Sequence, residues 1–228
     1  MIPVYNEDPE ILRPVVNSIL SKGFNVLIID DGSDMKYEFT KTDHLYFMRH
    51  ALNCGQGEAL NSGFKFALTN GFKSAISFDG DGQHDPKEII LFEERMRENP
   101  KDILLGSRFL NINGSNVGFF KKIILKCGIL LNYILSGILL TDSNCGFRMF
   151  NKKAMKQIRF KAKRMGHASE LMWLIKFNKL SYTEVPVNIK YTDYSKKKGQ
   201  HFLRIFPVTI EILKYYFRFI MQRKLLVR

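Results

Sequence analysis

The chain has 228 residues, of which 45% are apolar and 13% aromatic, a composition that is typical of a folded domain and excludes a disordered chain. The net charge is +13, but residues 1–114 carry −5 and residues 115–228 carry +18. This asymmetry predicts a protein that handles anions at a negatively charged surface. Nucleic acid would also fit the charge, but the sequence contains no nucleic-acid-binding motif, so we exclude that class.

The cysteine pattern and the hydropathy indicate the cellular compartment in which the protein is found. Cys54, Cys127 and Cys145 are odd in number and scattered, which indicates reduced thiols rather than disulfides or a zinc site. The chain begins without the charged and apolar regions of a signal peptide, and no apolar run reaches the roughly 18–20 residues that span a bilayer. We therefore expect a cytoplasmic protein.

The first elements expected along the chain are a strand end, a helix and a buried strand. Residues 2–7 have the pattern of a strand end and the loop after it, so we expect a first strand that is trimmed. The start signal Asp8-Pro9 predicts a helix over residues 10–22. Residues 25–29 form an apolar run that predicts a buried strand ending in Asp30-Asp31.

The next segment contains a strand over residues 45–49 and then a glycine-rich turn. Gly55 and Gly57 lead into an amphipathic helix that is expected to end near residue 70. The third glycine of a dinucleotide-binding fingerprint is absent at the required spacing, so we reject that function.

Acidic residues then follow a short apolar run at residues 74–78. Asp79 and Asp81 are separated by one glycine, so both carboxylates can point the same way and share a divalent cation. In open α/β sheets ligands bind at the carboxyl ends of the strands, and hard oxygen ligands suit Mg²⁺ or Mn²⁺. An isolated Asp-x-Asp is more often an acidic surface turn, but its position after a buried-type strand favours a metal–phosphate site. Asp85-Pro86 predicts the start of a helix over residues 87–98.

The remaining pattern completes an α/β fold with a helical extension. A strand at residues 103–105 ends in Gly106-Ser107-Arg108, and the order of elements over residues 1–110 predicts a mostly parallel sheet flanked by helices. Beyond it we expect a helix over residues 117–140, a polar turn at 142–148, a helix over 169–178, a strand over 182–191, a basic loop at 195–200 and an amphipathic helix over 203–223.

Several motifs stand in one order. They are Pro3 to Glu7, Asp30 to Ser33, Asp79 to His84, Gly106 to Arg108, Asp142 to Arg148, Glu184 to Pro186 and Tyr194 to Lys196. Together they resemble family 2 glycosyltransferases of the GT-A fold, and most closely the dolichyl- and polyprenyl-phosphate sugar synthases. The resemblance implies a Rossmann-like catalytic domain over residues 1–200, with a nucleotide-sugar half (1–110) and an acceptor half (111–200). Residues 201–228 would form an amphipathic helix at a membrane.

The resemblance also implies a donor site. A carboxylate at Asp31 would hydrogen-bond the nucleotide base, and the first loop would line the base and ribose. Arg148 and the loop at residues 196–198 would cover the pyrophosphate. The full nucleotide-sugar set is Pro3, Tyr5, Glu7, Asp31, Gly57, Asp79, Arg148 and Lys197.

A metal site and an acceptor site follow from the same resemblance. Asp79, Asp81 and Gln83 would hold Mg²⁺ or Mn²⁺ against the diphosphate, so that the metal stabilises the leaving group. His84 is expected to contact the metal ligands rather than the metal. The acceptor phosphate would be bound by Arg108, Lys122 and Lys126, and the catalytic residues would be Asp79, Asp81 and Arg108.

The function that the resemblance implies is an inverting, metal-dependent transfer of a hexose from a UDP- or GDP-sugar to a polyprenyl phosphate, at the inner face of the membrane. A phosphate acceptor is already anionic, whereas the alternative acceptor, a hydroxyl of a growing glycan, would require a carboxylate base. The motif pair typical of processive polysaccharide synthases is absent, which favours the phosphate. The alternative of another class is an inactive membrane-associated scaffold. The expected partners are the nucleotide-sugar, the lipid phosphate, an anionic membrane surface that the last helix contacts, and a second copy or a membrane protein.

Overall fold

The computed structural model describes residues 1–110, 128–130, 132–162, 166–190, 213–217 and 221. Within them, three parallel strands form one sheet: β1 (Ile2–Val4), β2 (Val26–Asp30) and β3 (Leu45–Arg49). A second sheet has the order β4 (Ser74–Ser77), β6 (Arg148–Asn151), β5 (Ile103–Ser107) and β7 (Tyr182–Pro186). In it β5 and β7 are parallel, whereas β6 is antiparallel to both of its neighbours.

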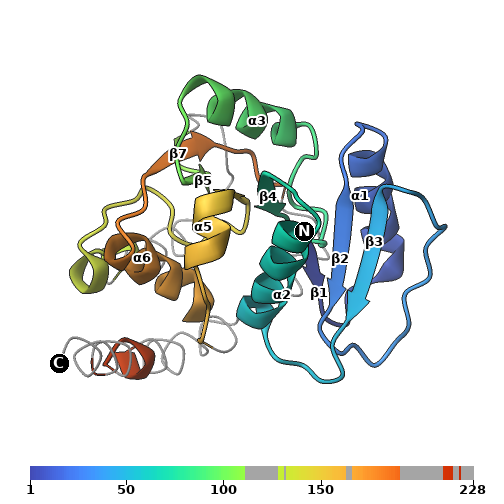
Figure 1. The fold of residues 1–228 in the computed structure, drawn as a ribbon, viewed down its shortest axis with the longest axis horizontal. Coiled ribbons are helices and arrows are strands. Elements are labelled where there is room, and N and C mark those ends of the chain that lie inside the picture. The colour runs from blue at the N-terminus through green and yellow to red at the C-terminus, as the bar shows by residue number, and fades with distance from the viewer. Residues whose placement is uncertain (111–127, 131, 163–165, 191–212, 218–220, 222–228) are drawn as a thin grey trace.

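Backbone hydrogen bonds join the two sheets at β1 and β4. The amino group of Met1 donates to the carbonyl of Ile76 at 2.7 Å, and the amide of Phe78 donates to the carbonyl of Met1 at 2.9 Å. The strands therefore form one continuous surface (Figure 1). The first strand, which the sequence led us to expect as a trimmed piece, is short but hydrogen-bonded on both sides.

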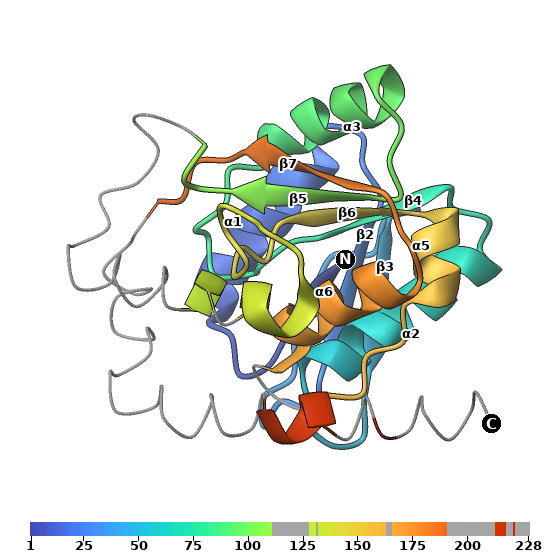
Figure 2. The same cartoon turned by 90° about the vertical axis from the view of Figure 1, so that its left-hand side faces the viewer.

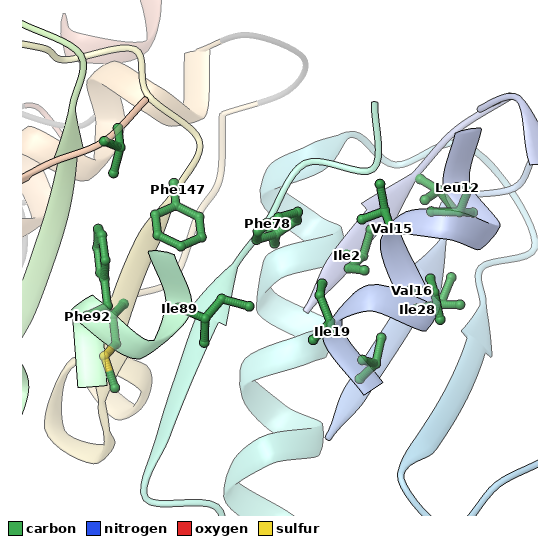
Figure 3. Packing of buried hydrophobic residues seen from close by; sticks show 14 of the residues in the cluster. Ile2, Leu12, Val15, Val16, Ile19, Ile28, Phe78, Ile89, Phe92 and Phe147 are labelled. Carbon is green, nitrogen blue, oxygen red and sulfur yellow. The ribbon is translucent and has the colours of Figure 1, made fainter. Parts of the chain in front are cut away.

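Helices cover both faces of this surface (Figure 2). The helices α1 (Pro9–Leu20) and α3 (Glu88–Glu98) pack on one face, where Leu12, Phe92 and Phe147 belong to one buried cluster (Figure 3). The other face is covered by α2 (Gln56–Thr69), α5 (Lys152–Gln157) and α6 (His167–Phe177), whose cluster includes Phe64 and Trp173. The predicted α/β fold is confirmed.

Local signals explain where α1 begins and ends. The carboxylate of Asp8 accepts a hydrogen bond from the amide of Glu10 at 2.9 Å, and Pro9 occupies the first turn, where a missing N–H costs nothing. Gly23 follows the helix with a φ of +81°, a conformation that glycine adopts without steric cost.

Most predicted boundaries in the described residues differ from the observed ones by two residues or fewer, but two are wrong by more. The helix expected to reach residue 140 ends at residue 136, because Gly137 adopts a φ of +70° and the chain then turns inward to bury Ile138 and Leu140. The strand expected over residues 182–191 ends at Pro186. Val187 still donates to the Ser107 carbonyl of β5 at 3.0 Å, and after it the chain bonds to the Asp79 loop, where the Lys190 amide donates to the Gln83 carbonyl at 2.8 Å.

The C-terminal segment is described only at residues 213–217 and 221. Residues 213–217 are helical, as predicted, and the ring of Tyr216 lies 5.2 Å from that of Trp173, centroid to centroid. The basic loop at residues 195–200 and the start of the long helix at 117–127 lie outside the described residues. In the part of the chain that the structure describes, no helix combines the length and the apolar character needed to cross a membrane.

Candidate active site

The predicted site residues gather at one edge of the sheet. The loops after β1, β2, β4 and β5 all leave this edge, and β6 begins there because it runs in the opposite direction. Asp31, Asp79, Arg108 and Arg148 therefore come from four different strands that meet at one edge, although they are far apart in sequence. A cavity lined by Met1, Val26 and Ser74 opens at the opposite edge and contains none of these side chains.

Asp79 stands at the centre of this edge. Its Oδ2 lies 3.2 Å from Nε2 of His84, a buried side chain whose ring contacts Phe78 and Phe147 at centroid distances of 5.5 and 5.3 Å. A Cβ atom at Gly146 would collide with the Asp79 carboxylate, so only glycine leaves room for the carboxylate here. His84 therefore contacts Asp79, and the metal-binding role of Asp79 stays a prediction.

Asp81 lies on the same loop, and Gln83 holds it. The Gln83 amide donates to Asp81 Oδ1 at 3.1 Å, and Gln83 Nε2 donates to Asp81 Oδ2 at 2.6 Å. Both groups that Gln83 uses here are N–H donors, so its side-chain oxygen is not used in holding Asp81.

The two carboxylates differ in their electrostatic surroundings. Burial raises the pKa of Asp81, and the negative charge of Asp79 raises it further. For Asp79, burial also acts to raise the pKa, but the hydrogen bond and charge of His84 and the charges of Arg148 and His167 outweigh it, so the pKa is lowered. A pair of mutually repelling carboxylates on one loop offers the oxygen ligands that Mg²⁺ or Mn²⁺ prefers, so Asp79 and Asp81 fit such an ion.

Asp31 is buried and anchored by the loop that precedes α2. Its Oδ1 accepts from the Cys54 amide at 3.0 Å, and its Oδ2 accepts from the Gly55 amide at 2.7 Å. Nδ1 of His50 lies 2.7 Å from Oδ1, and Nε2 of His50 lies 2.9 Å from Oγ of Ser62. His50 was missed from the sequence because no motif marks it.

Asp31, His50 and Cys54 also offer three metal-ligand atoms within 4.8 Å of one another. However, the hydrogen bonds above engage both oxygens of Asp31 and both ring nitrogens of His50. We therefore assign this trio to the positioning of the Asp31 loop.

The other residues predicted for the donor site lie in β1, in the loop after it and in α2. Pro3 is half-buried in β1, and Tyr5 is exposed at the edge. Glu7 is buried, and its amide donates to the hydroxyl of Tyr37 at 2.6 Å. Gly57 lies inside α2, where a Cβ atom would come within 3.0 Å of Phe160 Cβ, so its observed role is close packing against that segment.

Arg108 forms a buried ion pair that the sequence did not predict. Its Nε donates to Asp142 Oδ2 at 2.6 Å and one terminal nitrogen donates to Oδ1 at 3.0 Å, the two-pronged geometry of a strong Arg–carboxylate pair. Glu184 in turn accepts from the amides of Thr141 and Asp142, so β7 holds the loop that carries Asp142. The separation of 34 residues between Arg108 and Asp142 gives no sequence signal for the pairing.

Arg148 is buried at the start of β6, and its terminal nitrogen donates to the carbonyl of Ser143 at 3.2 Å. The charge of Arg148 acts on Asp79, so the predicted pyrophosphate-binding arginine and the predicted metal ligand are brought together. Lys122, Lys126 and Lys197, which complete the predicted acceptor and donor sites, lie outside the described residues.

Comparison with known proteins shows to which family the chain belongs. Residues 1–159 match the model of Glycosyl transferase family 2. The UDP-N-acetylglucosamine–dolichyl-phosphate N-acetylglucosaminyltransferase of Methanococcus voltae is 31% identical over 235 residues, which cover 93% of each chain.

Solved structures agree on the fold. Mannosyl-3-phosphoglycerate synthase from Rubrobacter xylanophilus has a TM-score of 0.67 at 12% identity, and the match covers 98% of this chain and 73% of that one. Glucosyl-3-phosphoglycerate synthase from Mycobacterium tuberculosis, in complex with Mn²⁺, UDP-glucose and phosphoglyceric acid, has a TM-score of 0.65 at 14% identity, covering 94% and 78%. The chain thus belongs to glycosyl transferase family 2 and is a glycosyltransferase.

Proposed function

We propose that this glycosyltransferase moves a hexose from a UDP- or GDP-sugar to the phosphate of a polyprenyl lipid of the dolichyl type, with Mg²⁺ or Mn²⁺ at Asp79, Asp81 and Gln83. The observation that carries the proposal is the meeting of this donor set with Asp31 and Arg148 at one edge of the sheet. The relative from Methanococcus voltae is named for a UDP-sugar and dolichyl phosphate, which supports a UDP-linked donor and this acceptor class.

On the donor side, Asp31 would receive the nucleotide base. A carboxylate has about four lone-pair sites. Cys54, Gly55 and His50 engage three of them, so one remains to accept from a ring N–H of the base. Tyr5, exposed on the loop after β1, would lie against the base and ribose together with Pro3 and Glu7.

On the leaving-group side, Asp79, Asp81 and Gln83 would hold the divalent ion. The bound ion would supply positive charge to the diphosphate as it departs. Arg148, with the Lys197 loop, would add to the same charge. His84 would keep the carboxylate of Asp79 aimed at the ion, because its own ring is fixed between two phenylalanines.

On the acceptor side, Arg108 would bind the lipid phosphate with Lys122 and Lys126. The side chain of Asp142 holds the Arg108 guanidinium through Nε and one terminal nitrogen, which fixes this positive charge at the edge of the sheet. Since the acceptor oxygen is anionic, the reaction would need no general base, and in-line attack would invert the anomeric carbon.

Residues 201–228 would hold the enzyme at the cytoplasmic face of the membrane. In the described part, Tyr215 and Tyr216 pack against the catalytic domain, while Phe217 is 63% exposed and Met221 is 65% exposed. This terminal segment would therefore present one side to the protein and another to the lipid.

The acceptor class is tested by product formation from labelled UDP-sugars with Mn²⁺ in the presence of polyprenyl phosphate or the corresponding polyprenol. We expect a glycolipid with the phosphate and none with the alcohol. Asp81→Asn is expected to lower the rate by about 100-fold or more, while Asp85→Asn on the same loop is the matched control with an unchanged rate. Product with a glycan acceptor and none with polyprenyl phosphate would contradict the proposal.

A further inference from the structure

Residues 128–136, which precede Asp142 in the chain, bury polar side chains and expose apolar ones. Within residues 128–136, the polar side chains face the protein: Asn132 and Ser136 are only 5% and 7% exposed. The Asn132 amide donates to Oγ of Ser143 at 3.2 Å, and Oγ of Ser136 donates to the Asn132 carbonyl at 2.6 Å. A helix on the surface of a globular protein normally does the reverse.

The outward face of the same segment is apolar. Leu130, Tyr133 and Ile134 lie three and four residues apart, on one side of the helix, and are 58%, 45% and 68% exposed. Beyond the helix, Leu139 is 68% exposed between the buried Ile138 and Leu140. We call Leu130, Tyr133, Ile134 and Leu139 the apolar patch.

The C-terminal segment continues this side of the molecule. Both views place residues 128–136 and residues 213–217 on the same side, with α3 at the other end from residues 213–217 (Figures 1 and 2). Phe217 and Met221 are exposed there, as described above. Exposed apolar side chains gathered on one side of a protein are typical of an interaction site.

The charged residues near the apolar patch indicate which kind of partner it contacts. Residues 128–140 contain no charged residue, and the only charged residues of 171–180 are Lys176 and Lys179, both exposed. A Cβ atom at Gly137 would lie 3.9 Å from Nζ of Lys176, which places this cation beside the patch. In residues 212–228 every charged residue is Lys or Arg, and the described one, Lys214, is exposed. An apolar surface with an exposed lysine beside it and a basic terminal segment on the same side of the molecule suits an anionic lipid leaflet.

We propose that the apolar patch is a membrane-contact surface of the catalytic domain, additional to the terminal segment, and that it sits on the surface of an anionic leaflet. The patch joins directly to the acceptor side, since Leu139 is three residues from Asp142, which holds Arg108. Contact of the patch with the leaflet would bring Arg108 to the level of the lipid phosphates at the membrane surface. The inference rests on the proposed lipid-phosphate acceptor.

The test is co-sedimentation of the full chain with vesicles of phosphatidylcholine alone or with about one third phosphatidylglycerol. The variant Ile134→Glu/Leu139→Glu is expected to bind the anionic vesicles about tenfold or more weakly, because two large apolar side chains no longer enter the lipid. Ile90→Glu is the matched control, because Ile90 is an exposed isoleucine on α3 at 45% and is expected to bind like the unaltered chain. Lys176→Ala is expected to weaken binding about fivefold on anionic vesicles only.

Two further measurements separate this inference from the proposed function. Thermal stabilisation by UDP with Mn²⁺ is expected to be the same in the double variant and the unaltered chain, and so is transfer to a short, water-soluble isoprenyl phosphate. Only transfer to long-chain polyprenyl phosphate in vesicles should fall. Equal vesicle binding by the double variant and the unaltered chain would overturn the inference. A shift from dimer to monomer in the double variant, with vesicle binding unchanged, would overturn it in favour of a second copy.

Discussion

At the scale of single residues, the site depends on a few close contacts that fix charged groups. Asp79 is held between His84 and the space that Gly146 leaves open, and Arg108 is held by Asp142. In our proposal the holding residues His84, Gly146 and Asp142 touch neither donor nor acceptor. Substituting them therefore tests how the site is positioned, without removing a group that contacts a substrate.

Gly146→Ala is expected to lower the transfer rate by about 100-fold, because the new Cβ atom displaces the Asp79 carboxylate by the order of an ångström. Gly128→Ala is the control, since a Cβ atom there meets nothing closer than the Asn144 side chain at 3.7 Å. Initial rates at saturating Mn²⁺ would measure the effect. Full activity of Gly146→Ala would show that the observed position of Asp79 is not the catalytic one.

Asp142→Ala is expected to destabilise the fold by about 3–5 kcal/mol, because it leaves the buried guanidinium of Arg108 without its carboxylate. Asp85→Ala removes an exposed pair with Lys190, at 3.5 Å, and the hydrogen bond from the Lys87 amide at 3.0 Å, and is expected to cost about 1–2 kcal/mol. Urea unfolding midpoints of the two variants would be compared. Similar losses in both would mean that the Arg108–Asp142 pair adds little to stability.

At the scale of elements, Asp102 ties the ends of several strands together. Its Oδ2 accepts from Lys153 Nζ and the Ser181 backbone amide, both at 2.8 Å, and its Oδ1 accepts from Asn151 Nδ2 at 3.0 Å. Burial alone would raise the pKa of Asp102, but these hydrogen bonds outweigh it and lower the pKa from 3.8 to about 2.

Since the folded state holds Asp102 ionised to lower pH than the unfolded state, its contribution is fully present above pH 4 and is lost as the pH falls through 2. Asp102→Asn is therefore expected to cost about 2 kcal/mol at pH 7. The difference in unfolding free energy between the variant and the unaltered chain should shrink as the pH approaches 2. A difference that does not change with pH would contradict this ionisation.

Elements whose signals are local were predictable from the sequence. The helix starting at Asp8-Pro9, the strand at residues 45–49 and the acidic loop after β4 were all recognisable from caps, turns and short apolar runs. The strand β6 was not, because Arg148–Asn151 is four residues long and becomes a strand only by pairing antiparallel with β4 and β5. The Arg108–Asp142 pair and His50 were missed for a related reason, since their partners come from distant parts of the chain.

At the scale of the whole molecule, our proposal assigns two tasks to one edge of the sheet. This edge gathers the carboxylates that we propose for the donor, and the loop that follows the apolar patch carries Asp142 to the same edge from the proposed acceptor half. The negative charge of the first half and the positive charge of the second are consistent with this division. A metal-bound nucleotide would meet a lipid phosphate between them.

The measurement that tests this account most directly is thermal unfolding with UDP, in the presence and absence of Mn²⁺. We predict that UDP raises the unfolding temperature only with Mn²⁺, since a ligand at 100 times its dissociation constant adds about 2.7 kcal/mol to stability. The rise should be lost in Asp81→Asn and kept in Asp85→Asn. An equal rise without Mn²⁺, or in Asp81→Asn, would contradict a metal-held diphosphate at Asp79 and Asp81.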